Sequence, residues 1–180
     1  MALIFVLGIF STPLNVSADS TADDLVIMDF TDPANYNDSN NALKNSVSGV
    51  RFCKSTRHTF SGDKSCQYLI GGGGTGASFN LNDVNGTATL TGTDFSKYNA
   101  INMWIYSAEE PDSNYSIRFF LFSGETGAWR NRAYVVIPRT WTGWEKITLC
   151  FEDFKYPSGS DAFDWSNVTK AQFMHGDENY

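Results

Sequence analysis

Short segments in which apolar and polar residues alternate recur along most of the chain, separated by stretches rich in glycine, asparagine and serine. Such alternation is typical of a β-strand with one buried face, whereas an amphipathic helix has a longer period. No segment after residue 18 has a convincing helical period, and the spacing of the segments predicts an all-β sandwich of two antiparallel sheets. The predicted strands cover residues 25–30, 50–53, 65–70, 77–93, 101–106, 116–122, 133–137, 144–151 and 168–174.

Alternation also assigns each residue of a predicted strand to one of its two faces. We expect the core-facing set to be Ile101, Met103, Ile105, Ile117, Phe119, Leu121, Val135 and Ile137. The residues between them form a second set that shares the other face: Trp104, Tyr106, Arg118, Phe120, Phe122, Tyr134 and Val136. This set is too apolar for an ordinary solvent-exposed surface. It is therefore either a binding surface or a second small core covered by residues 31–45 or 71–85.

The N-terminus has the pattern of an export signal. Residues 3–10 are apolar, and residues 16–18 place small side chains at the two positions that a signal peptidase reads. The usual basic residues are missing, and a buried N-terminal strand is the alternative. The apolar stretch is too short to span a membrane, so no membrane association is expected after cleavage. The predicted organisation is a signal peptide at 1–18, cleaved after Ala18, a leader at 19–24 and a secreted domain at 25–180.

Charge and composition narrow the range of ligands. The 180 residues carry a net charge of −7, and 15% of them are aromatic. A nucleic-acid partner is not expected, because such binding needs a basic surface that displaces counterions from phosphates. Arg118, Arg130 and Arg132 are candidates for a local basic patch. An acidic surface rich in aromatic residues suits a neutral ligand better than an anionic one.

The three cysteines, Cys53, Cys66 and Cys150, have no zinc-site spacing and no histidine nearby at ligand spacing. An exported chain could pair two of them, with Cys53 and Cys66 as the local option. The alternative is that all three are small apolar residues of the core. The sequence leaves the pairing open.

Residues suited to catalysis are few. The chain has two histidines and none of the common nucleophile or metalloprotease motifs. The glycine-rich segment at 71–76 lacks the Lys-Ser/Thr that completes a phosphate loop, so it is interpreted as a flexible connection. Carboxylates at Glu109, Glu110, Glu125, Glu152 and Asp153 lie in predicted loops or at strand ends, where charge is expected anyway. We expect a non-catalytic domain.

Several motifs resemble a known family. They include Asp94-Phe95-Ser96, Trp141-Thr142-Gly143-Trp144, Phe151-Glu152-Asp153-Phe154 and Asp164-Trp165-Ser166. Together with the strands between them, they resemble the galactose-binding-like jelly roll of carbohydrate-binding modules, close to family 11. Related modules sit beside glycoside hydrolases and polysaccharide lyases. The resemblance covers roughly residues 25–174. It implies that Trp144, Phe151, Phe154 and Trp165 pack the fold.

The resemblance implies a secreted module that binds polysaccharide or oligosaccharide and targets a covalently linked catalytic domain to it. The alternative is a structural or protein-contact β-sandwich of a larger secreted enzyme, with no small ligand of its own. Aromatic rings stack on the C–H face of a pyranose, and planar polar groups bind its hydroxyls. We therefore expect a sugar site formed by Trp104, Tyr106, Arg118, Phe120 and Tyr134, extended by Trp129 and Arg132.

The resemblance also implies a structural calcium ion near the first strand. Its ligands would be Asp29 and carbonyls of the 62–65 turn, with Asp63 as a further oxygen donor. Calcium takes about six to eight oxygen ligands, so these residues supply part of a set. Modules of this type close with a strand that carries an acidic pair, and no such segment follows residue 174. We expect a jelly roll that lacks its last strand, in a protein that continues beyond Tyr180.

Overall fold

The computed structural model describes residues 2–6, 52–55, 57, 59, 65–69, 76–81, 92–108, 110–112, 115–124, 131–157 and 163–175 of the chain. These residues form two β-sheets and contain no α-helix; a 3₁₀ turn, Phe151–Asp153, follows β8. The strands are β1 (Ala2–Val6), β2 (Phe52–Ser55), β3 (Ser65–Leu69), β4 (Gly76–Asn80), β5 (Ala100–Ser107), β6 (Ser116–Ser123), β7 (Arg132–Pro138), β8 (Gly143–Cys150) and β9 (Val168–His175).

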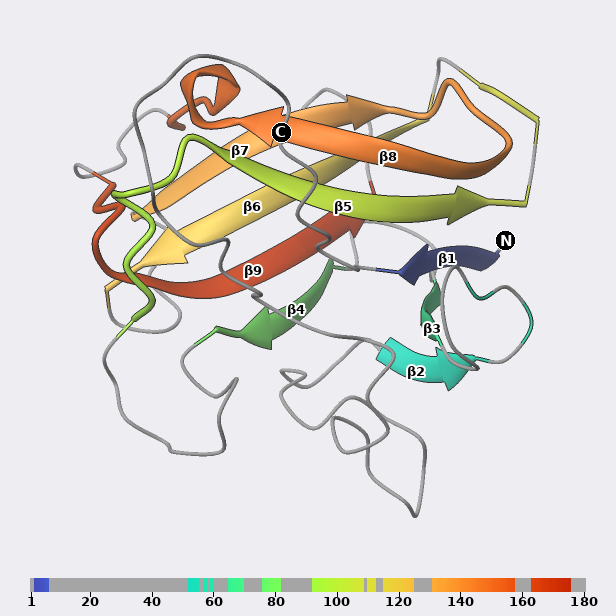
Figure 1. The fold of residues 1–180 in the computed structure, drawn as a ribbon, viewed down its shortest axis with the longest axis horizontal. Helices are drawn as coiled ribbons and strands as arrows, with labels where there is room; N and C mark the ends of the chain where they lie inside the picture. Colours follow the sequence, from blue (N-terminus) through green and yellow to red (C-terminus); the bar gives the residue numbers. More distant parts are fainter. Residues whose placement is uncertain are drawn as a thin grey trace.

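The two sheets pack face to face, with β5 and β8 in front of β6 and β7 in Figure 1. The five-stranded sheet has the order β2-β3-β1-β5-β8, and the four-stranded sheet has the order β4-β9-β6-β7. Neighbouring strands are antiparallel throughout both sheets. The predicted all-β sandwich of two antiparallel sheets is therefore confirmed.

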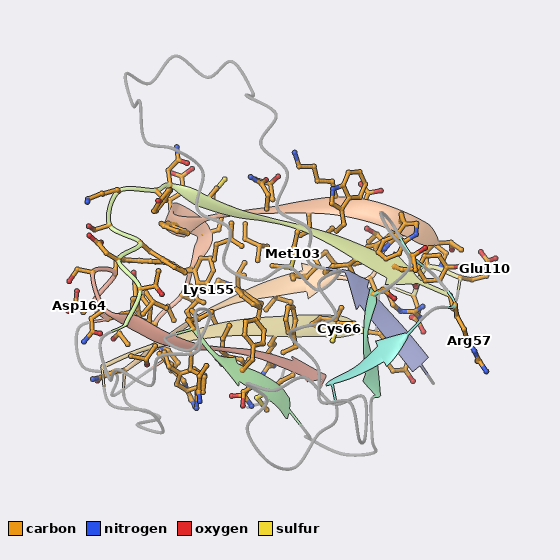
Figure 2. The ribbon with its side chains drawn as sticks, turned by 60° about the horizontal axis from the view of Figure 1, so that its bottom comes forward. Arg57, Cys66, Met103, Glu110, Lys155 and Asp164 are labelled. Atoms are coloured by element: carbon orange, nitrogen blue, oxygen red, sulfur yellow. The ribbon has the colours of Figure 1, made fainter. Side chains whose placement is uncertain are left out.

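The core forms where the inner faces of β5 and β6 meet. Every second residue of β5 is buried, and Met103, which is fully buried, lies between the sheets (Figure 2). The ring of Phe119 from β6 packs against that of Phe173 from β9, with centroids 4.8 Å apart. Each such side chain contributes about 1.5–3 kcal/mol when it leaves water. The predicted core-facing residues of β5, β6 and β7 all belong to this core or pack against it.

Strand β1 occupies the middle of the five-stranded sheet. It pairs with β3 through Ala2–Phe5 and with β5 through Ile4–Val6. This segment belongs to the predicted signal peptide, and its position corresponds to the alternative, an N-terminal strand within the fold. Cleavage after Ala18 stays a prediction. Ala18 and the strand predicted at 25–30 lie outside the described residues.

Most observed strands begin and end within one residue of the predicted bounds, and two strands before residue 100 depart further. The strand predicted at 50–53 is β2, Phe52–Ser55, and β4, Gly76–Asn80, forms only the beginning of the long segment predicted at 77–93. Farther on, Thr93 forms an isolated bridge with Val168. Strand β2 pairs with β3 so that Lys54, not Cys53, stands opposite Cys66. Cys66 is buried and is not part of a disulfide, so the local Cys53–Cys66 bridge is not formed.

Matching turns hold one end of the sandwich. The carboxylate of Asp94 accepts hydrogen bonds from the hydroxyl of Ser96 at 2.6 Å and from its amide at 2.9 Å. Asp164 accepts the same two bonds from Ser166, at the same distances. The amide of Phe95 then donates to the carbonyl of Trp165 and joins the two turns. These repeated Asp-x-Ser turns connect the segment that leads into β5 to the one that leads into β9.

An aromatic cluster packs beside these turns. The rings of Phe151 and Trp165 stack with centroids 4.1 Å apart, and Phe154 meets Trp165 edge-on at 5.5 Å. Phe154 is buried in the core, and the other two pack against it. The expectation that these three residues pack the fold is therefore confirmed.

Candidate functional site

The residues predicted to share one sugar-binding face lie on two different faces. Trp104 and Tyr106 belong to β5 in the five-stranded sheet, whereas Arg118 and Phe120 belong to β6 in the four-stranded sheet. Each set points away from the core, because the residues that alternate with it are core residues. The two sets therefore lie on opposite outer faces of the sandwich. The prediction that they share one face is wrong, because alternation fixes a face of a strand and not the sheet to which the strand belongs.

The outer face of the four-stranded sheet carries a strip of aromatic and cationic side chains. Phe120 and Tyr134 stand opposite each other on β6 and β7, with ring centroids 5.5 Å apart. The Phe122 ring lies 6.3 Å from that of Phe120, and the guanidinium carbon of Arg132 lies 5.7 Å from the centre of the Phe120 ring. Lys170 of β9 places its Nζ 3.9 Å from the centre of the Phe122 ring. The distances from Arg132 and Lys170 to these rings are in the range of cation–π contacts.

Two rings of this strip are closed to solvent, whereas Arg132, Tyr134 and Lys170 are partly exposed. Phe120 is 5% exposed and Phe122 is 1% exposed, although both point away from the core. Arg118, on the same strand, is 9% exposed. Burial lowers the pKa of the Arg132 guanidinium, an effect that the neighbouring Tyr134 opposes. Stacking on a sugar needs an accessible ring face, so Phe120 and Phe122 do not offer a binding surface in this structure. The strip has the character of a second small core.

The outer face of the five-stranded sheet is more open. Tyr106 of β5 stands opposite Trp144 of β8, and their rings meet edge-on, with centroids 5.1 Å apart. Trp104 lies two residues before Tyr106 on the same face, and its cross-strand neighbour is Lys146. All four side chains are partly exposed. We call Trp104, Tyr106 and Trp144 the aromatic platform.

Polar side chains continue this face beyond the aromatic platform. Asn102 stands opposite Thr148, and the Thr148 hydroxyl donates a hydrogen bond of 2.8 Å to the Asn102 Oδ1. That bond leaves the amide nitrogen of Asn102 available as a donor and fixes its orientation. The face therefore combines three aromatic rings, a lysine and an oriented amide along two adjacent strands.

Trp144 is the site residue that the sequence interpretation assigned to packing. The motif Trp141-Thr142-Gly143-Trp144 suggested two tryptophans with one structural role. Trp141 has that role, since it is 8% exposed and its Nε1 donates to the carbonyl of Ile105. Gly143 then adopts a φ of 83°, and Trp144 emerges on the outer face. The alternation of β8, read backward from buried Leu149, was the signal that identifies Trp144 as outward-facing.

The remaining predicted site residues lie outside the described part of the chain. They are Trp129, expected to extend the sugar site, and the expected calcium ligands Asp29 and Asp63. Among the residues that are described, no cluster of three or more histidine, cysteine, aspartate or glutamate side chains is placed to hold a metal ion. The calcium site stays a prediction.

Comparison with known proteins leaves the family open: no protein-family model matches the chain, and neither does any curated protein. None of the described segments forms a helix long and apolar enough to cross a membrane.

Proposed function

We propose that the chain is a secreted, non-catalytic carbohydrate-binding module that binds polysaccharide on the outer face of the five-stranded sheet. The pairing of Tyr106 with Trp144 beside Trp104 is the observation that supports it, because it places three partly exposed rings on one continuous face. The resemblance to galactose-binding-like modules supports the same function. It also suggests that the module directs a covalently linked enzyme to its substrate.

The chemistry of the face suits a neutral sugar chain. A pyranose presents C–H groups on its flat side, which stack on aromatic rings, and hydroxyls around its edge, which need donors and acceptors. Trp104 and Tyr106 are two residues apart on one strand, a separation of about 7 Å, so neighbouring sugar units can meet successive rings. Lys146 and Asn102 then supply donors to hydroxyl oxygens. A sheet face of this shape accepts an extended chain rather than a single enclosed sugar.

The alternative function is a structural or protein-contact domain of a larger enzyme. The burial of Phe120 and Phe122 favours a structural role for the outer face of the four-stranded sheet. This alternative predicts that no polysaccharide binds and that the aromatic platform contacts another protein domain.

Affinity gel electrophoresis with soluble β-glucan, xylan and galactan tests the proposal. Removing one stacking ring should cost about 1 kcal/mol, which is about a fivefold loss of affinity. We expect Trp104→Ala and Trp144→Ala to weaken binding by at least this factor to whichever polysaccharide slows the migration of the unmodified chain. Both variants should still melt cooperatively. Tyr156→Ala is the matched control, since Tyr156 is 51% exposed and lies outside the platform. Equal migration of all variants on every polysaccharide would count against the proposal.

A further inference from the structure

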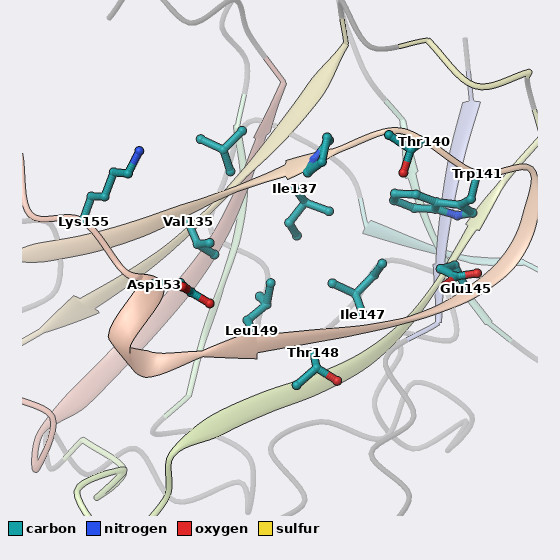
Figure 3. A pocket seen from close by; sticks show the side chains of 12 residues that line it. Val135, Ile137, Thr140, Trp141, Glu145, Ile147, Thr148, Leu149, Asp153 and Lys155 are labelled. Atoms are coloured by element: carbon teal, nitrogen blue, oxygen red, sulfur yellow. The ribbon is translucent and has the colours of Figure 1, made fainter. Parts of the chain in front are cut away.

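A groove of about 610 Å³ opens between the edge strands β7 and β8. Figure 3 shows Val135 and Ile137 on one side of it and Ile147 and Leu149 on the other. Ile137 and Leu149 belong to the core, and the other two pack against it. Apolar side chains of the core and its neighbours therefore form the floor of the groove between the two sheets.

The open edge of β8 borders this groove along its length. The amide of Phe151 donates to the carbonyl of Asn99, which fixes the alternation of hydrogen bonds between β8 and β5. In an antiparallel ladder, every second residue directs its N–H and C=O away from the partner strand. The backbone groups of Trp144, Lys146, Thr148 and Cys150 therefore point outward, and Lys146 and Thr148 lie in the middle of the strand. Within the described part of the chain, β8 pairs with β5 and with no other strand.

The edge strand on the other side of the groove, β7, already pairs with a segment added to its edge. Tyr134 of β7 exchanges two backbone hydrogen bonds with Lys155, at 2.9 and 2.8 Å, in an isolated antiparallel bridge. This bridge covers one end of the β7 edge. The β8 edge, eight residues long, is the longer border of the groove.

Charges distinguish the two ends of the groove. Asp153 and Lys155 lie at one end, and their side chains carry opposite charges. Glu145 lies at the other end, near Thr140 and Trp141, and is the only charged residue among the described lining residues there. Its side chain is exposed. The end at Glu145 is therefore complementary to a positive charge.

We propose that the β8 edge binds an extended peptide segment of another protein as an added β-strand. Alternate apolar side chains of the peptide enter the groove between Ile137 and Ile147, and a lysine or arginine pairs with Glu145. Backbone hydrogen bonds to Lys146 and Thr148 provide affinity, and the groove provides selectivity, as in other cases of strand addition. This binding mode is independent of the carbohydrate proposal, because it uses the strand edge and inner-face side chains and not the aromatic platform.

The test uses a fluorescein-labelled peptide that matches the eight residues of β8 in length. It alternates valine with threonine and carries lysine at one end, in two versions that place the lysine first or last. Fluorescence anisotropy should show saturable binding of one version to the full chain. Thr148→Pro removes the outward N–H at an edge position where proline is tolerated, and it should weaken binding at least tenfold. Thr148→Ala keeps that N–H and is the matched control.

A charge exchange tests the selectivity. Glu145→Lys should bind a peptide with glutamate in place of the lysine better than the original peptide, whereas the unmodified chain should show the reverse preference. A purely structural role of Glu145 would not produce this exchange. The proposal is overturned if neither peptide binds at millimolar concentration, if Thr148→Pro binds as well as Thr148→Ala, or if sedimentation shows that the edge is already occupied by a second copy of the chain.

Discussion

The ammonium nitrogen of Lys170 lies 3.9 Å from the centre of the Phe122 ring, which is 1% exposed. The ring stabilises the cation, but burial lowers the pKa of Lys170 below its usual 10.5. Between the lowered pKa and 10.5, the unfolded chain holds the proton more tightly than the folded chain does. Stability contributed by this group therefore rises as the pH increases through that interval.

We expect Lys170→Met to remove this pH dependence. The free energy of unfolding in urea, measured from pH 7 upward, should increase less with pH in the variant than in the unmodified chain. At neutral pH the variant should be at least as stable, because methionine has no charge to desolvate. Lys97→Met is the control, since Lys97 is exposed on the turn before β5. Parallel curves for Lys170→Met and the unmodified chain would contradict the assignment.

Removal of a core ring should separate structural residues from binding residues. Phe173 is completely buried and contacts Phe119, so Phe173→Ala should destabilise the domain by about 3–5 kcal/mol. Trp104→Ala on the outer face should have a much smaller effect. Urea unfolding followed by tryptophan fluorescence measures the stability of Phe173→Ala. Circular dichroism follows the unfolding of Trp104→Ala, because that variant has lost one of the tryptophans. Similar losses in both variants would place Trp104 in the core.

Gly143 should be sensitive to substitution even though no atom lies within 4 Å of a Cβ placed there. Its φ of 83° is a conformation that residues with a Cβ adopt at a cost of about 1–2 kcal/mol. Gly143→Ala should therefore lower the free energy of unfolding by about this amount, without a steric clash. Gly143→Asn should lose less, because asparagine tolerates this conformation better. If alanine and asparagine have the same effect, backbone strain is not the cause.

Calcium should stabilise the domain if the predicted ligands hold it. We expect added calcium to raise the melting temperature and EDTA to reverse the increase, because a ligand that binds only the folded state stabilises it. Asp29→Ala and Asp63→Ala should each reduce the response. Magnesium at the same concentration is the control, since it binds poorly to sites built for a larger ion. A melting temperature that is insensitive to EDTA would contradict the predicted calcium site.

The sequence predicted which residues of β5, β6 and β7 face the core, and it did so for a local reason. Alternation with a period of two is a property of one strand, so Ile101, Met103 and Ile105 could be assigned without knowledge of the partner strands. The sheet to which each strand belongs depends on pairing between distant segments. For that reason Trp104 and Arg118 were placed on one face although they belong to different sheets.

The site was harder to predict because its members come together through register. Tyr106 and Trp144 are separated by a long stretch of chain and become neighbours only because β5 and β8 pair in one alignment. A shift by one residue would turn Trp144 to the inner face. The motif around Gly143 marks the start of β8, but it does not show which of its two tryptophans emerges. The groove between β7 and β8 depends on the same kind of non-local arrangement.

The central position of β1 links the predicted cleavage after Ala18 to the time at which the chain folds. Residues 2–6 precede both of their partner strands in the chain, β5 by more than 90 residues. Removal of residues 1–18 from a folded molecule would separate β2 and β3 from β5 and β8 and expose two new edges. A peptidase that acts before the sheet closes would instead remove β1 before it can pair with β3 and β5. If the chain is cleaved after Ala18, the order of cleavage and folding therefore decides whether β1 joins the five-stranded sheet.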